Sequence, residues 1–171
     1  GTVNDLTASI GDALPGDLTW SYVNFGDYNQ DGLVNVADLS QIGIHFQKQG
    51  PWDYSEVESV VDGTPDGVIS VADLTPIGLN YLRRLTGYKV YRSAGDVFDP
   101  QQLELYAEVE LSAASGGVSS RKTFRTDIND DVINAAAWLC VAPIDSGDST
   151  EGPLSNTVQA TVTGDNTPPV W

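Results

Sequence analysis

Two short segments of the chain place oxygen-bearing residues at regular spacing. Residues 27–38 read DYNQDGLVNVAD and residues 62–73 read DGTPDGVISVAD, so the second segment repeats the pattern of the first. A hard cation takes about six to eight oxygen ligands, and a twelve-residue loop supplies them from positions 1, 3, 5, 7, 9 and 12. The spacing therefore predicts that each segment is a loop that binds one Ca²⁺ ion.

Each loop has its own set of predicted oxygen ligands. In the first loop they are Asp27, Asn29, Asp31, the carbonyl of Leu33, Asn35 and Asp38. In the second loop they are Asp62, Thr64, Asp66, the carbonyl of Val68, Ser70 and Asp73. Thr64 offers only a hydroxyl or a carbonyl where the first loop has an asparagine, and Pro65 stiffens the turn beside it. We therefore expect the second site to bind calcium more weakly than the first.

The residues between the ligands also match what such a loop requires. Gly32 and Gly67 occupy position 6, where the chain turns sharply and a positive φ is needed. Val34 and Ile69 at position 8 are apolar and could join the two loops through a short β bridge. The alternative is a turn rich in Asp, Asn and Gly that holds no metal. Two copies in register favour calcium over that alternative.

The repeat resembles a bacterial type I dockerin module over residues 24–85. The resemblance lies in two loops that end in Asp rather than Glu, each followed but not preceded by a predicted helix, at 36–46 and 71–85. It implies that calcium is needed for folding and that a cohesin-like domain is the partner. The partner-facing residues would be Val36-Ala37 and Val71-Ala72, where cellulosomal dockerins often carry Ser-Thr pairs.

The rest of the chain predicts strands separated by turn residues. The predicted strands are 3–8, 17–22, 88–93, 103–111, 122–126, 135–144 and 155–163. Several of them resemble a fibronectin type III β-sandwich: 3–8 its strand A, 17–22 strand B, GYKVYRS strand C, AWLCVAPID strand F and GPLSNTVQATV strand G. Leu18 and Trp20 alternate toward the expected interior of this sandwich.

The strands that resemble A and B precede the calcium loops, and the others follow them. We therefore expect a mostly β fold with a small α insert, in which residues 1–23 and 87–164 form the sandwich, residues 24–86 form the dockerin-like insert, and residues 165–171 form a linker. Loop tips tolerate such insertions. The alternative, two independent domains in series, would leave an incomplete sandwich with exposed edges.

Composition limits the classes of partner. The net charge is −16, and the sequence has neither a basic patch nor an apolar stretch of the ~20 residues that span a membrane. We therefore expect no nucleic-acid partner and no membrane insertion. Cys140 is the only cysteine, so an intramolecular disulfide is impossible, and its apolar neighbours predict a buried, inert thiol.

No catalytic arrangement stands out. His45 is the only histidine, and we expect it to be partly exposed on a helix rather than to act as a general base. Residues 127–132 look like a third calcium loop but lack glycine at position 6, so they are interpreted as an acidic turn. Residues 145–148 are interpreted as a hairpin loop. The chain is therefore not expected to be an enzyme.

Three functions are compatible with these features. The first is a non-catalytic calcium-binding structural or interaction module of a larger secreted or cell-surface bacterial protein, with this chain a monomeric fragment of it. The second is a dockerin that recruits a cohesin-like partner for polysaccharide degradation. The third is a carbohydrate-binding module that uses Trp52 and Tyr54, although packing of these rings over the insert is the simpler interpretation.

Overall fold

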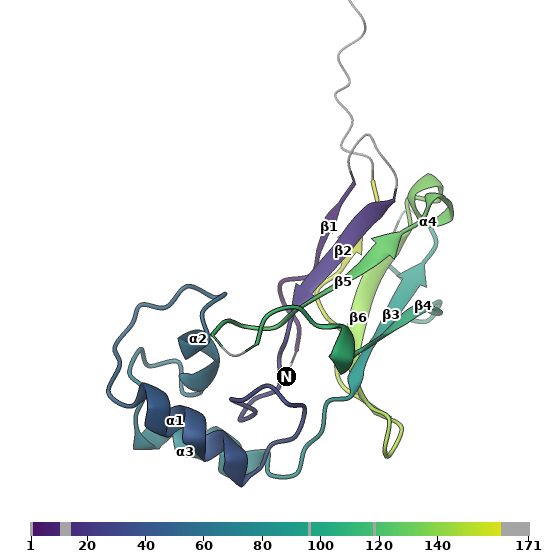
Figure 1. Cartoon of the computed structure of the whole chain (residues 1–171). Coiled ribbons are helices and arrows are strands. Elements are labelled where there is room, and N and C mark those ends of the chain that lie inside the picture. The colour runs from purple at the N-terminus through teal and green to yellow at the C-terminus, as the bar shows by residue number, and fades with distance from the viewer. Residues whose placement is uncertain (1, 11–14, 96, 118, 162–171) are drawn as a thin grey trace, which may run out of the picture.

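The chain is mostly β-structure, arranged in two antiparallel sheets (Figure 1). The computed structural model describes residues 2–10, 15–95, 97–117 and 119–161, so the expected linker at 165–171 and the last expected sandwich residues, 162–164, lie outside the described residues. The strands are β1 (Thr7–Ser9), β2 (Gly16–Ser21), β3 (Gly87–Ser93), β4 (Glu104–Glu110), β5 (Thr123–Ile128), β6 (Trp138–Asp145), β7 (Thr150–Glu151) and β8 (Val158–Gln159). One sheet has the order β1-β2-β5, and the other has the order β4-β3-β6-β7, with β8 also paired to β6.

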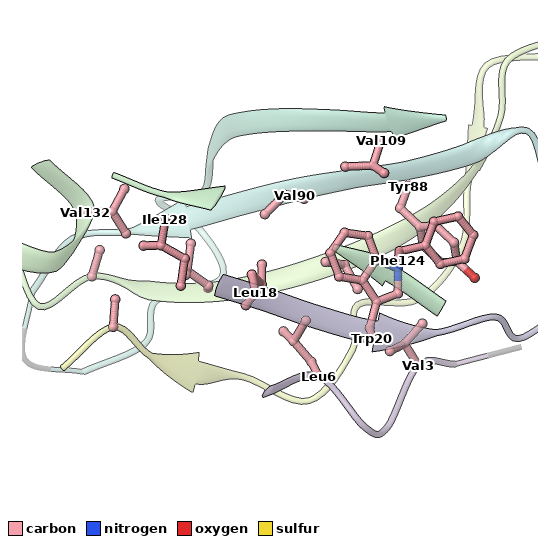
Figure 2. Packing of buried hydrophobic residues seen from close by; sticks show 14 of the residues in the cluster. Val3, Leu6, Leu18, Trp20, Tyr88, Val90, Val109, Phe124, Ile128 and Val132 are labelled. Carbon is pink, nitrogen blue, oxygen red and sulfur yellow. The ribbon is translucent and has the colours of Figure 1, made fainter. Parts of the chain in front are cut away.

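Hydrophobic side chains from both sheets form the larger core (Figure 2). Leu18 and Trp20 of β2 are buried, as the alternation in the sequence predicts. The ring of Trp20 lies 5.6 Å from the ring of Tyr88 in the opposite sheet, and Tyr88 lies 4.8 Å from Phe124. These edge-to-face contacts join β2 and β5 to β3, so the sheets pack face to face.

The strand expected over residues 3–8 forms only at its end. Val3 and Leu6 are buried in the core, but strand pairing starts at Thr7. The side chain of Asn156 explains the difference, because it accepts a hydrogen bond from the Leu6 amide and donates one to the Leu6 carbonyl, both at 3.0 Å. The Asn156 side chain thereby takes the place of the backbone hydrogen bonds that a neighbouring strand would make with Leu6.

A short helix, α4 (Asp130–Asn134), lies where the sequence predicted an acidic turn at 127–132, whose first two residues instead end β5. The strand predicted at 135–144 starts later, at Trp138. The N-cap of α4 is Asn129, whose side chain accepts a hydrogen bond from the Val132 amide. Two aspartates in the first turn place negative charge at the positive end of the helix dipole, which stabilises the helix. The hairpin expected at 145–148 is present, since Asp145 pairs with Thr150.

The segment between β2 and β3 has a separate hydrophobic core. The other helices are α1 (Leu39–His45), α2 (Glu58–Val61) and α3 (Leu74–Leu79), and single 3₁₀ turns at Val36–Asp38 and Val71–Asp73 precede α1 and α3. In Figure 1 these helices lie together at the end of the molecule farthest from α4. The separate core consists of Tyr28, Val34, Ile42, Val57, Val61, Ile69 and Ile77. In the described part of the chain, no helix is long and apolar enough to cross a membrane.

Two helix predictions in this segment differ from the structure. The second helix was expected to reach residue 85, but α3 ends at Leu79. There the Asn80 side chain donates to the Pro76 carbonyl at 2.9 Å, and the chain turns so that the Leu82 amide can donate to the Val34 carbonyl of the first loop. The second loop is also preceded by a helical turn, α2, which the sequence comparison with dockerins did not predict.

The thiol of Cys140 gives a direct test of the packing of β6. Cys140 is fully buried, and burial raises its pKa to about 11, compared with about 8.5 for a free cysteine. We expect the native protein to react negligibly with a disulfide reagent near neutral pH, whereas the protein in guanidinium should release one equivalent. Rapid labelling of the native protein would contradict this packing.

Candidate metal centre

The aspartate at position 1 has the same hydrogen-bond partners in both loops. In the first loop, Asp27 Oδ1 accepts the amide of position 5 at 3.1 Å and Oδ2 accepts the amide of position 6 at 2.8 Å. In the second loop, Asp62 accepts the equivalent amides at 3.2 and 2.9 Å. The sequence repeat is thus a structural repeat at this position.

The aspartate at position 12 closes each loop. Asp38 Oδ1 accepts the amides of positions 2 and 3 at 2.8 and 3.1 Å, and Oδ2 accepts the amide of position 9 at 2.8 Å. Asp73 accepts the amide of position 3 at 3.0 Å and that of position 9 at 2.7 Å. The Thr64 hydroxyl also donates to Asp73, at 2.8 Å. The residue that distinguishes the second loop is therefore engaged with another predicted ligand.

The remaining predicted ligands make short-range contacts within their loops. Asn29 Oδ1 accepts the Asp31 amide at 2.9 Å, and the Asn35 side chain donates to the Leu33 carbonyl at 3.1 Å. In the second loop, the Asp66 carboxylate accepts the amide of position 7 at 2.8 Å and the Ser70 hydroxyl accepts the amide of position 11 at 3.1 Å.

Both position 6 glycines adopt the backbone conformation that the sequence predicted. The φ angle is +94° at Gly32 and +80° at Gly67. A Cβ atom on Gly32 would also lie 2.5 Å from the Leu85 carbonyl oxygen. The sharp turn and the close packing at the first loop therefore both require glycine.

The aspartates at positions 1 and 12 are buried in both loops. The exposed fraction is 0 % for Asp27, Asp38 and Asp73 and 6 % for Asp62. Among the described residues, none of the four forms an ion pair with Lys, Arg or His. Burying an ionised carboxylate without an opposite charge is unfavourable. Burial accordingly raises the pKa of Asp27 and Asp38.

Nearby charges strengthen this effect at the first loop. After burial, the charge of Asp38 also raises the pKa of Asp27, and the charge of Asp31 raises the pKa of both. A hydrogen bond from Tyr22 to Asp27 acts in the opposite direction. Mutual repulsion shows that the three carboxylates of this loop act on one another, which is the electrostatic setting that a divalent cation relieves.

The donor chemistry of the loops fits Ca²⁺ better than a transition metal. Within the described residues, no three side chains of His, Cys, Asp or Glu lie together as a metal-binding group, and this includes the three carboxylates of each loop. Each predicted set adds neutral oxygens suited to a hard cation to three carboxylates. The neutral oxygens are two side-chain amides and a carbonyl in the first loop, and two hydroxyls and a carbonyl in the second. The carboxylates of positions 1 and 12 also direct their oxygens to backbone amides.

The sequence suggested that the two loops pair with each other through Val34 and Ile69, but these two residues do not pair. Each is joined instead to the segment that follows the other loop's helix. The Val34 amide donates to the Arg83 carbonyl at 3.0 Å, and the Ile69 amide donates to the Lys48 carbonyl at 3.1 Å. The Tyr28 hydroxyl adds a direct link, because it donates to the Asp73 carbonyl at 2.7 Å. The two loops are therefore interlocked.

His45 is buried rather than partly exposed, which corrects the expectation from the sequence. Its Nδ1 lies 3.0 Å from a carboxylate oxygen of Glu58, and Lys48 Nζ lies 2.6 Å from the same oxygen. These contacts join α1 to α2. The polar partner explains how a histidine can be buried within the insert.

The first loop is also built into the sheets. The hydroxyl of Tyr22, directly after β2, donates to the Asp27 carboxylate. The fully buried side chain of Gln30, at position 4, donates to the Gly117 and Ser120 carbonyls at 3.1 and 3.0 Å and accepts the Lys122 amide at 2.7 Å. The first loop thus contacts both β2 and the segment before β5.

Arg121 holds the same junction from the side of the sheets. Its guanidinium donates to the carbonyls of Tyr22, Tyr54 and Ser59 at 3.0, 2.8 and 3.0 Å. It also lies over the Tyr54 ring, 3.9 Å from the centroid. One side chain therefore connects the end of β2 with the segment between α1 and α2.

Equivalent positions of the two repeats expose large apolar residues. We call this set the paired apolar face. Its members are Val36, Leu39, Ile44 and Phe46 in the first repeat and Val71, Leu74, Leu79 and Tyr81 in the second. Exposed apolar residues that gather on one surface are typical of interaction sites.

Gln30 provides a test of the junction. Replacing it with alanine should lower the free energy of unfolding by about 1–3 kcal/mol, because the buried carbonyl of Gly117 and the part-buried Ser120 carbonyl and Lys122 amide lose their partner. Chemical denaturation measures the change. Gln101→Ala is the control, since that residue is exposed and its replacement should not change the free energy of unfolding measurably. Equal stability of the two variants would show that the contacts of Gln30 do not hold the junction.

Comparison with known proteins adds no family to this picture. No protein-family model, no curated protein and no solved structure matches the chain. The resemblances to dockerins and to fibronectin type III domains therefore stay predictions from the sequence motifs.

Proposed function

We propose that the insert binds two Ca²⁺ ions and that the chain is a non-catalytic interaction module of a larger extracellular bacterial protein. The observation that carries the calcium proposal is the burial of four aspartates, at positions 1 and 12 of both loops, without a cationic partner among the described residues. A divalent cation in each loop supplies the missing positive charge. It also fixes residues that repel one another without it.

The residues that would hold each ion are those at alternate positions of the repeat. They are Asp27, Asn29, Asp31, the Leu33 carbonyl, Asn35 and Asp38 for the first ion, and Asp62, Thr64, Asp66, the Val68 carbonyl, Ser70 and Asp73 for the second. The common hydrogen-bond pattern at positions 1 and 12 supports equivalent roles in the two loops.

The first ion would have a second role at the junction. Asp27 accepts a hydrogen bond from Tyr22, and Gln30 of the same loop is bonded to the segment before β5. Ordering this loop with calcium therefore also orders the contact between the insert and the sheets. The second loop contributes to the insert core and is linked to the first through Tyr28.

Calcium removal tests the metal proposal. A ligand that binds only the folded state stabilises it by about 2.7 kcal/mol when the free ligand concentration is a hundred times Kd. Adding EDTA to the calcium-loaded protein should therefore lower Tm by several degrees, and calcium in excess should restore it. Magnesium at the same concentration serves as the control cation. A melting curve that is unchanged by EDTA would refute calcium binding.

The two sites should differ in strength. Calorimetry of the intact chain should resolve a tighter and a weaker site. Asp27→Ala should remove the tighter one and Asp62→Ala the weaker one, because Thr64 supplies a poorer ligand than Asn29 and already donates to Asp73. Two equal sites, or loss of the tighter site in Asp62→Ala, would contradict this order.

The paired apolar face supports the interaction part of the proposal. If the chain were only a calcium-reinforced spacer, α1 and α3 would gain by packing their apolar residues against the sheets. Instead, Ile44 and Leu79 at equivalent positions are more than two-thirds exposed, at 67 and 76 %. The face fits a partner with a flat apolar surface, and the resemblance to dockerins identifies a cohesin-like domain as the first candidate.

Charge substitutions on this face test docking. The test is the double variant Val36→Asp/Val71→Asp, measured against a panel of bacterial cohesin domains. Those that bind the parent chain should bind the variant at least about thirtyfold more weakly, which corresponds to ~2 kcal/mol. Both side chains are exposed, so Tm should not change. The matched control is Val97→Asp, an exposed valine outside the face. Failure of every cohesin to bind the parent chain would favour the purely structural role.

A further inference from the structure

A cleft of about 510 Å³ lies between the insert and the sheets. Its walls come from the N-terminal segment, from the turn after β2, from the segment between α1 and α2, from α2 and the second loop, and from Arg121 before β5. The volume falls within the roughly 300–1,000 Å³ of small-molecule sites, and junctions between structural units are a common place for them. The cleft borders the second calcium loop at Asp62, Gly63, Pro65 and Gly67, but none of its lining residues belongs to the paired apolar face.

Five aromatic residues line the cleft, and three of them, Phe25, Trp52 and Tyr54, are partly exposed, whereas Tyr22 and Tyr28 are buried. Phe25 and Tyr54 are 57 and 50 % exposed, and Trp52 is half-buried against the insert core. Large apolar side chains that gather in a concave, open site leave surface that a ligand can cover. The rings come from two separate parts of the chain, so the fold brings them together.

Contacts hold the rings of Trp52 and Tyr54 in position, and the backbone is constrained beside Phe25. The indole N–H of Trp52 donates to Asp62 at 3.2 Å, and the ring lies so close to Gly50 that a Cβ atom there would be 3.2 Å from it. The Arg121 guanidinium covers one face of Tyr54. Gly26 has a φ of +92° and packs against the Pro76 carbonyl, which fixes the turn that carries Phe25. The aromatic surface is therefore ordered before a ligand arrives.

The polar groups of the cleft are mostly neutral. Asn4 and Asn24 provide amides, of which the Asn24 nitrogen also donates to the Asp27 carboxylate at 3.2 Å, while the Ser59 hydroxyl bonds within its own segment. The two charged groups are already engaged, because Asp62 accepts amides of its own loop and Arg121 donates to three backbone carbonyls. With a net charge of −16, the protein also repels anionic ligands. The ligand that fits is thus neutral, with apolar faces and several hydroxyls.

We propose that this cleft binds a neutral oligosaccharide, whose pyranose faces stack on Phe25, Trp52 and Tyr54 while Asn4 and Asn24 bond its hydroxyls. A sugar ring combines C–H groups on its faces with hydroxyls around its edge. Rigid aromatic rings beside amide side chains complement both features at little entropic cost. This binding site is separate from the proposed docking face.

The test uses the whole chain in calcium-containing buffer, with cellohexaose, xylohexaose and mannohexaose as probes. We expect at least one of them to bind, with a change in tryptophan fluorescence and a heat of binding in calorimetry. Phe25→Ala and Trp52→Ala should each weaken that binding about tenfold or more, equivalent to ~1.4 kcal/mol. Because Trp52 also packs on the insert core, Phe25→Ala is the decisive variant, and unchanged Tm verifies its fold.

Phe46→Ala is the matched control. Phe46 is similarly exposed, at 47 %, but belongs to the paired apolar face rather than to the cleft. Its substitution should leave oligosaccharide binding unchanged. The proposal is overturned if no probe binds, if binding survives Phe25→Ala, or if Phe46→Ala weakens it equally. Binding of an oligoproline peptide through Phe25, with no sugar bound, would likewise replace the sugar with a peptide ligand.

Discussion

A carboxylate that leaves water needs compensation, and the insert buries four of them. Asp27, Asp38, Asp62 and Asp73 are surrounded by backbone amides that point toward their oxygens. Amide dipoles lower the cost of a buried charge but do not neutralise it. The sharp glycine turns, the 3₁₀ turns and the crossed pairing of the two repeats all serve to bring those amides into place. The architecture of the insert follows from this electrostatic requirement.

Only a few side chains connect the loops that carry these aspartates to the sheets. Tyr22 follows β2 directly, is fully buried, and donates to Asp27. Gln30 and Arg121 then satisfy backbone groups that the junction would otherwise bury unpaired. Polar side chains that bond to backbone define a geometry more sharply than apolar packing does. The cleft with its three partly exposed aromatic rings exists because these contacts hold the two parts at a fixed separation.

Local sequence patterns were sufficient for the structural repeat of the two loops, for the position 6 glycines and for most strands, because turn residues and alternation depend on near neighbours. Features that depend on distant residues could not be predicted. His45 is buried because Glu58 meets it, α3 stops at Leu79 because the next residues pair with the first loop, and Asn156 replaces strand pairing at Leu6. The signal for α4 was present locally, as Asn129 followed by two aspartates, and was misread as a turn.

The position of the insert between β2 and β3 has a consequence for how the chain folds. Strands β2 and β5 pair in register, Leu18 opposite Thr126, across the whole length of the insert and two further strands. Closing so long a segment costs chain entropy before any contact compensates for it, and such contacts slow folding. An insert that has already folded holds Tyr22 and Leu85 at its two ends near each other through its own bonds, since the Leu85 amide donates to the Gly32 carbonyl. It then acts as a short connection in place of a long one, and lowers the entropic barrier to assembling the sheets.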